Sequence, residues 1–361
     1  MTRTGTVAGL ACVLLLAGAA PAVAQAPYPA PLEADFVARD VRFESGEVAS
    51  EVRLHYRTIG RPRADADGVV RNAVLILHGT GGSGAGFAGE NYAGRLFAKG
   101  QLLDAERYFI ILPDNIGHGG SSKPSDGLRM RFPQYRYADM VRLQHRLVTD
   151  GLGLSHLRLI MGTSMGAMHA WMWGYMFPTF ADGLVPLASN PVAIAGRNRV
   201  WRKLLVDAIV TDPSWRDGNY TEPPRGMASA LGFLLLATSV PLQWQKDFPT
   251  QQAADDWLAG QIARRMQTTD ANDTIYQFRS SEDYDPSAHL GEISAPLLAI
   301  NSADDFVNPP ELPMMEALIG QVKRGRFVLV PISDDTRGHG THSRPQVFGP
   351  YLAEFLEQIG R

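Results

Sequence analysis

From residue 72 onward, short apolar runs alternate with stretches in which apolar residues recur at helical spacing. The apolar runs are Ala73–Leu77, Tyr108–Leu112, Leu157–Met161, Gly183–Leu187, Pro296–Ile300 and Phe327–Val330. Continuous apolar runs of this length are typical of strands that are buried on both faces of a parallel sheet. Segments between them, such as Tyr137–Thr149 and Ala167–Phe177, carry helical patterns. The alternation predicts an α/β fold in which helices cover both faces of a mostly parallel sheet.

The part of the chain before residue 72 has a different pattern. Two strand-like stretches lie at Phe36–Val48 and Val52–Ile59, and Ser45-Gly46 suits a turn between them. Residues 25–34 are rich in proline, and we expect this entry segment to be loosely ordered.

One long interval interrupts the alternation of predicted strands and helices. Between Ala188 and Pro296 the chain is rich in Trp, Met, Arg and Pro and contains several helical stretches. Connections within α/β units are usually far shorter. We therefore predict a helical cap, inserted at about residues 190–284, that covers an active site. A second independent domain is the less favoured alternative, because both flanks return directly into one sheet.

The first residues have a composition of their own. Arg3 supplies a short positive region, Val7–Ala20 is apolar, and Ala22-Val23-Ala24 is typical of a signal-peptidase site. The apolar run is too short to cross a bilayer as a helix. We expect residues 1–24 to be a cleavable signal peptide, and the mature chain to be secreted or periplasmic and to have no membrane span.

Composition narrows the chemistry further. The single cysteine, Cys12, lies in the expected leader, so the mature chain would have no disulfide and no thiolate ligand or nucleophile. The formal net charge of −3, with no basic patch, gives no indication of nucleic acid or anionic lipid as partners. The sequence does not indicate an oligomeric state.

The strongest chemical signal is Gly162-Thr163-Ser164-Met165-Gly166. A bare G-x-S-x-G string is a weak signal, but this one follows the apolar run Leu157–Met161 and opens a helical stretch. A nucleophile elbow requires this strand–turn–helix setting, since the serine lies on a sharp turn and larger side chains beside it would collide with neighbouring elements. The motif predicts that Ser164 is a nucleophile.

A serine hydroxyl needs a base, and in this setting the chain order is Ser, then acid, then His. His339 lies in the glycine-flanked loop Arg337–Thr341 after the last apolar run, where a loop hangs over the carboxyl end of the sheet. We predict His339 as the base and keep His342 as the alternative. His339 and His342 have no further ligand cluster beside them, so neither a metal nor any other cofactor is expected.

The acid is expected after the penultimate strand, where Asp304 and Asp305 are adjacent. Neighbouring residues of an extended loop face opposite ways, so only one of them can accept the Nδ1–H of the imidazole. The spacing from Asp305 to Pro309 is typical of an acid loop and favours Asp305. Asp304 stays open as the alternative.

A glycine-rich loop, His78–Gly84, follows the run Ala73–Leu77. We expect the backbone N–H groups of Thr80 and Met165 to form an oxyanion hole. The loop lacks the Lys-Ser/Thr ending of a phosphate-binding P-loop. His78 and His118 are expected to brace loops rather than to act in catalysis.

At these motifs the sequence resembles the homoserine O-acetyltransferase-like branch of the α/β-hydrolase superfamily. The matching segments are Tyr137–Pro178, with Asp139-Met140-Val141-Arg142 and Ser164-Met165-Gly166, then Asp212–Tyr220, Asn301–Pro310 and Arg337–Thr341. Asp212–Tyr220 is the most branch-specific of them, and the resemblance covers most of the chain from about residue 36. It implies an α/β-hydrolase fold and a triad of Ser164, Asp305 and His339 that forms an acyl-enzyme.

The sequence also departs from that branch. Its acetyltransferases tend to read Gly-Gly-Ser-Met-Gly-Gly-Met-Gln where this chain has Gly162-Thr163-Ser164-Met165-Gly166-Ala167-Met168-His169. An exported protein would also lack cytoplasmic acetyl-CoA, which makes water the expected acceptor. We therefore expect a secreted serine hydrolase that acts on small-molecule carboxylic esters, or on amides or lactones. A homoserine O-acetyltransferase-like acyltransferase with the same triad is the alternative, and a catalytically silent binding protein is disfavoured by the complete triad.

The predicted cap would determine specificity. Its aromatic and Met content favours an apolar pocket without fixing the substrate. Arg197, Arg199 and Arg202 could bind a carboxylate, and the competing interpretation is a solvated helix face.

Overall fold

The computed structural model describes residues 1–2 and 27–360. The predicted signal peptide beyond its first two residues, and its cleavage site, lie outside the described residues.

The described residues form one eight-stranded sheet with the order β1-β2-β4-β3-β5-β6-β7-β8. The strands are β1 (Leu32–Arg42), β2 (Val48–Ile59), β3 (Ala73–Leu77), β4 (Phe109–Pro113), β5 (Leu159–Thr163), β6 (Leu184–Leu187), β7 (Leu297–Ser302) and β8 (Gly325–Val330). The pairs β1–β2 and β2–β4 are antiparallel. The other six strands, β3 to β8, run parallel to one another. The predicted α/β fold with a mostly parallel sheet is confirmed.

The apolar runs form this sheet because both of its faces are covered. Strands β3 to β7 are buried along their whole length. Side chains alternate across a strand, so Leu75 and Leu77 join the core on one face of the sheet, and Val74 and Ile76 join the core on the other.

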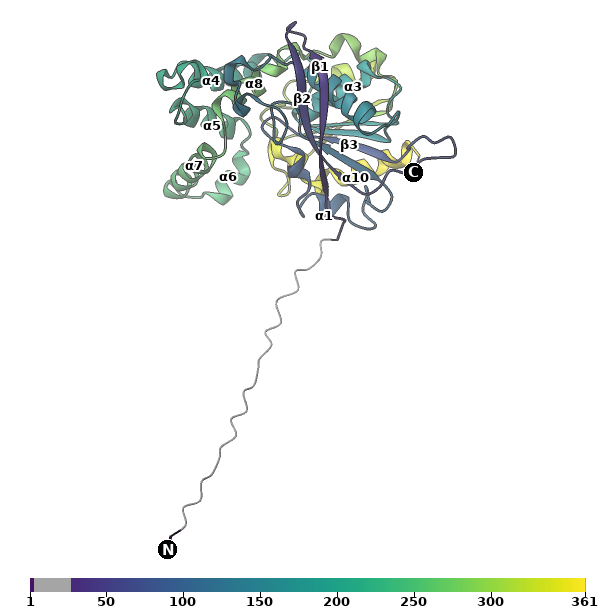
Figure 1. Cartoon of the computed structure of the whole chain (residues 1–361), viewed down its shortest axis with the longest axis horizontal. Helices are drawn as coiled ribbons and strands as arrows, with labels where there is room; N and C mark the ends of the chain where they lie inside the picture. The colour runs from purple at the N-terminus through teal and green to yellow at the C-terminus, as the bar shows by residue number, and fades with distance from the viewer. Residues whose placement is uncertain (3–26, 361) are drawn as a thin grey trace.

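Helices cover both faces of the sheet (Figure 1). They are α1 (Ala93–Leu96), α2 (Tyr137–Arg146), α3 (Met165–Met176) and α10 (Pro345–Gln358), and the short α9 (Met314–Leu318) lies between β7 and β8. Buried residues of α2 and α3 belong to one core cluster, and those of α1 and α10 belong to the other.

The N-terminal strands differ from their predicted limits. β1 begins at Leu32, inside the proline-rich segment, because its pairing with β2 extends from Leu32 opposite Thr58. It ends at Arg42, since residues 43–47 form a turn in which Gly46 has a φ of 86°. The expectation of a loosely ordered segment through residue 34 was therefore wrong for its last residues, and the predicted first strand was placed too late.

Five α-helices lie between β6 and β7, the interval in which the sequence predicts a cap. They are α4 (Gly196–Val210), α5 (Gly226–Ala237), α6 (Pro241–Asp247), α7 (Gln251–Met266) and α8 (Ala271–Arg279), and they gather on one side of the sheet (Figure 1). Leu205, Ile209, Met227 and Ile275 belong to a third core cluster, which α4, α5 and α8 share and against which α7 packs. The insertion therefore has a core of its own.

Polar contacts attach this helical insertion to the sheet domain. Asp273, in α8, accepts hydrogen bonds from the Ser125 N–H at 2.8 Å and from the Ser125 hydroxyl at 2.7 Å. Asp283 accepts from the backbone of Tyr137 at the start of α2. Within residues 27–360 no single helix is long and apolar enough to cross a membrane, although the sharply bent pair α5–α6 meets the test by length and composition alone.

Candidate active site

Ser164 occupies the turn between β5 and α3. Its backbone has φ 53° and ψ −111°, a conformation that residues with a Cβ atom rarely adopt and that is typical of strained functional positions. The Ser164 N–H donates to the Leu187 carbonyl at 2.9 Å, and its carbonyl accepts from Met168 N–H in the first turn of α3. Sheet and helix together therefore hold the strained residue in place.

The two motif glycines permit this turn by letting backbones approach closely. A Cβ at Gly162 would lie 2.0 Å from the Gly166 carbonyl oxygen, and one at Gly166 would lie 2.1 Å from the Leu77 carbonyl oxygen. Neither backbone neighbour can move aside as a flexible side chain could. Only glycine fits at both positions with α3 packed against β3 and β5.

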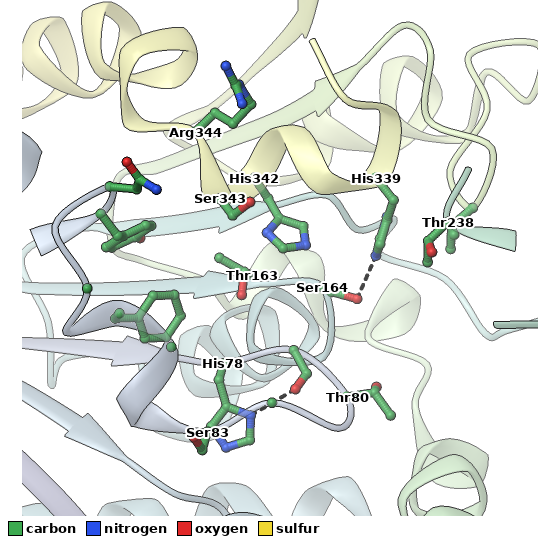
Figure 2. Close-up of a pocket in the computed structure, with 18 of the residues that line it drawn as sticks. His78, Thr80, Ser83, Thr163, Ser164, Thr238, His339, His342, Ser343 and Arg344 are labelled. Atoms are coloured by element: carbon green, nitrogen blue, oxygen red, sulfur yellow. Dashed lines mark hydrogen bonds between the residues drawn. The ribbon is translucent and has the colours of Figure 1, made fainter. Parts of the chain in front are cut away.

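The structure brings the three predicted triad residues together (Figure 2 shows two of them). His339 Nε2 lies 2.8 Å from Ser164 Oγ, and its Nδ1 lies 2.9 Å from Asp305 Oδ2. Asp305 lies just beyond β7, and His339 lies in a short 3₁₀ helix (Gly338–Ser343) after β8. Hydroxyl, imidazole and carboxylate thus form one hydrogen-bonded series at the carboxyl edge of the parallel strands.

Asp305 is buried and remains ionised. Burial favours a raised pKa, but the charge and hydrogen bond of His339 outweigh it, and the pKa of Asp305 lies below its usual value. Asn308 Nδ2 and the Val307 N–H donate to the same carboxylate at 3.0 and 2.8 Å. A carboxylate held in this way can orient the imidazole and stabilise its protonated form.

The alternative residues occupy other places. Asp304 accepts hydrogen bonds from the hydroxyls of Ser302 and Thr336, so it braces the loop and does not contact the imidazole. His342 is half-buried beside His339, with their ring centroids 5.3 Å apart. Burial lowers the pKa of His342 to about 3, and its Nδ1 has no hydrogen-bond partner. The geometry therefore favours Asp305 over Asp304 as the acid and His339 over His342 as the base.

The loop after β3 runs close to the nucleophile, as an oxyanion hole requires. A Cβ at Gly79 would lie 3.2 Å from Ser164 Cβ, so glycine allows the close approach. The Thr80 N–H donates to no other described residue. Met165 opens α3, where N–H groups have no intrahelical partner. Both amides are free to bind an oxyanion, and their role stays a prediction.

A buried polar network lies beneath this loop, and sequence reasoning missed most of it. His78 Nε2 accepts from the Asn115 N–H at 3.1 Å, so His78 Nδ1 carries the proton and donates to the Gly79 carbonyl at 2.8 Å. Gln144 donates to the Asn115 amide oxygen and accepts from the Trp173 indole N–H at 2.7 Å. Buried polar groups need such partners, and the network fixes the shape of the loop. His78 does brace the loop, as expected.

A cavity of about 880 Å³ opens above Ser164 and His339 between the sheet domain and the helical insertion. Its apolar lining includes Trp201, Leu234 and Phe278 from the insertion. Its charged lining consists of Glu90, Arg95, Arg202, Arg265 and Arg344. Among the described residues no group of three or more His, Cys, Asp or Glu side chains could hold a metal ion.

Comparisons with known proteins agree with this fold. A family model described as the alpha/beta hydrolase fold matches residues 72–330. The homoserine O-acetyltransferase of Carboxydothermus hydrogenoformans is 31% identical and aligns over 89% of this chain and 93% of its own. The crystal structure of homoserine O-acetyltransferase from Bacillus anthracis has a TM-score of 0.79 at 22% identity, over 91% of this chain and 98% of that one. Esterase E22 has a TM-score of 0.78 at 19% identity, over 90% and 100%.

Proposed function

Because the chain belongs to the homoserine O-acetyltransferase-like branch of the α/β-hydrolase family, we propose that it is a serine enzyme that transfers acyl groups through an acyl-enzyme on Ser164. The observation that carries this proposal is the hydrogen-bonded series from Ser164 Oγ through the His339 imidazole to the Asp305 carboxylate, with distances of 2.8 and 2.9 Å.

In the first half-reaction Ser164 Oγ attacks the acyl carbon while His339 Nε2 accepts the hydroxyl proton. Asp305, whose pKa is held low, stabilises the imidazolium that forms. The backbone N–H groups of Thr80 and Met165 would bind the negative oxygen of the tetrahedral intermediate. His339 then donates the proton to the leaving alkoxide, and an acyl ester remains on Ser164.

In the second half-reaction an acceptor attacks the acyl-enzyme. We propose water as this acceptor and carboxylic esters as the substrates. His339 would take a proton from water, and collapse of the second tetrahedral intermediate would release the acid and regenerate Ser164. The predicted leader supports this choice, because a mature enzyme outside the cytoplasm would have no acetyl-CoA. The fold also matches that of a protein described as an esterase.

An acyltransferase is the second candidate, and the names of the curated relatives favour it over hydrolysis. Homoserine O-acetyltransferases align with 89% of this chain at 28–31% identity. Product analysis separates the two candidates. Incubation with acetyl-CoA and homoserine would yield O-acetylhomoserine from an acetyltransferase, whereas a hydrolase would release acetate from simple esters without needing homoserine.

Replacing the nucleophile tests the shared mechanism. Ser164→Ala should lower kcat for p-nitrophenyl acetate by at least about 10³-fold, since it removes the hydroxyl on which the acyl-enzyme is proposed to form. Ser83→Ala is the matched control, because Ser83 lines the same cavity without contacting His339, and it should keep most of the activity. Comparable activity in Ser164→Ala and the unaltered protein would refute the proposal.

A further inference from the structure

Arg202 is a buried cation in the cavity that contains Ser164. It lies on α4, its residue is 3% exposed, and it lines that cavity together with Ser164 and Thr80. Its Nε donates to the Asn198 side-chain oxygen at 2.9 Å, and its Nη1 donates to the Ser281 hydroxyl at 3.4 Å. Both partners are neutral. No carboxylate of the described residues lies within 4.0 Å of the guanidinium.

The other two arginines of this helix have partners elsewhere. Arg199 lies 3.8 Å from Glu282, a carboxylate that also binds Arg136 at 2.7 Å. Arg197 lies over the Phe306 ring, 3.6 Å from its centroid. Of the three candidates from the sequence, only Arg202 combines burial, a place in the cavity and the lack of a counter-charge.

The surroundings of Arg202 supply aromatic rings and hydroxyls but no carboxylate of the described residues within 4.0 Å. The rings of Trp201 and Phe278 lie 5.1 and 5.4 Å from the guanidinium carbon. The Tyr137 hydroxyl is buried beside it and has no hydrogen-bond partner of normal geometry. Burying a charge is costly unless an opposite charge compensates it. Three further arginines and a single acid, Glu90, complete the charged lining, so the cavity as a whole favours an anion.

We propose that Arg202 is the subsite for a carboxylate that the substrate carries, so that preferred substrates are esters with a carboxylate on the acyl or the alcohol part. This inference rests on the proposed acyl transfer at Ser164. A carboxylate meets the planar guanidinium through paired, charge-assisted hydrogen bonds, which stabilise the complex more than neutral ones do. Arg202 would then select the substrate and place its ester bond over Ser164.

The test compares kcat/KM for matched charged and neutral esters. The acyl arm uses mono-4-nitrophenyl glutarate against 4-nitrophenyl pentanoate, and the alcohol arm uses 3-acetoxypropanoate against propyl acetate. We expect the unaltered protein to prefer the charged member of at least one arm. Arg202→Met should lower kcat/KM for that charged ester about 10- to 100-fold and change the neutral ester less than about threefold.

Two further variants separate recognition from folding. Arg199→Met removes a cation from the same helix outside the cavity and should keep the charge preference. Arg202→Lys, which retains a charge but loses the planar fork, should recover part of the lost rate. Equal losses on charged and neutral esters in Arg202→Met would overturn the inference, as would a lack of charge preference in the unaltered protein.

A binding measurement separates this inference from the proposed function. Monomethyl glutarate should raise the melting temperature of the Ser164→Ala protein, and dimethyl glutarate should not. A rise in melting temperature without turnover of any ester by the unaltered protein would support the subsite and refute acyl transfer. Turnover without a shift or a charge preference would refute the subsite and leave acyl transfer standing.

Discussion

His169 is fully buried in α3, behind the nucleophile rather than beside it. Its Nδ1 accepts a hydrogen bond from the Gln144 amide at 2.9 Å, so the ring is neutral in the folded protein. Burial lowers the pKa of His169 to about 3, and the nearby His78 contributes in the same direction. Because an unfolded chain protonates this ring near pH 6.5, His169 links folding stability to pH.

Replacing this ring should reduce acid sensitivity. Between pH 7 and pH 5 the unfolded state binds a proton at His169 and the folded state does not. The free energy of unfolding therefore falls as the pH falls. His169→Gln removes this linkage and can still accept the Gln144 hydrogen bond. Urea unfolding at both pH values should show that the unaltered protein loses about 2 kcal/mol more than the variant. Equal losses in the two proteins would contradict the neutral assignment.

At the residue scale, the sequence predicted which side chains lie close together where a backbone motif fixes geometry. Ser164, Asp305 and His339 follow strands whose carboxyl ends meet at one edge, so their proximity could be predicted before any contact was known. Arg197, Arg199 and Arg202 could not be told apart, because all three lie on one polar helix. Only the packing of α4 against α8 decides which of them is buried.

At the scale of elements, the apolar runs predicted every parallel strand, and no strand end was displaced by more than two residues. β5 was predicted from Leu157 but begins at Leu159, since Leu157 forms only an isolated bridge with Ala181. Strand ends depend on how far the neighbouring strand extends, which one segment of sequence does not contain. The helix predicted over Tyr137–Thr149 likewise changes to a π-helical turn at Leu147.

The elbow offers a test of element packing. Gly166→Ala would place a Cβ 2.1 Å from the Leu77 carbonyl oxygen and force α3 away from β3. We expect a loss of about 1–3 kcal/mol in the free energy of unfolding, measured in urea, together with reduced esterase activity.

Gly232→Ala is the matched control for this substitution. Gly232 lies inside α5 with nothing within 4 Å of the added Cβ, so alanine there should stabilise the helix by up to about 1 kcal/mol. A Gly166→Ala protein as stable as the unaltered one would mean that α3 is less tightly packed than its contacts indicate.

For the whole molecule, the sequence predicted where the helical insertion interrupts the sheet but not how it docks. The bonds between Ser125 and Asp273 join positions 148 residues apart. No local pattern indicates that either residue joins the insertion to the sheet domain. In the sequence alone, Asp273 is one of the acidic residues that commonly occupy the first turn of a helix. The positive lining of the cavity arises in the same way, because its arginines come from separate segments and meet only in the folded chain.

The expected signal peptide leads to a prediction about N-terminal processing. In a bacterial host, the exported chain should begin at Gln25, as intact-mass measurement would show. Ala24→Tyr should block this processing, because signal peptidase accepts only small side chains at that position. Val23→Tyr is the control and should be processed, since the middle position is not restricted. A chain that keeps Met1 in the periplasm would contradict the predicted cleavage.

The distance in sequence between nucleophile and base, 175 residues, has a consequence for biosynthesis. A nascent chain emerges from its N-terminus, so the elbow can form on the ribosome long before the segment that follows β8 has been translated. Until that segment docks, the hydroxyl has no proton acceptor. The Ser164 hydroxyl of the nascent chain would therefore not react with esters inside the cell. It would become a nucleophile only after the segment that follows β8 has been translated and has docked.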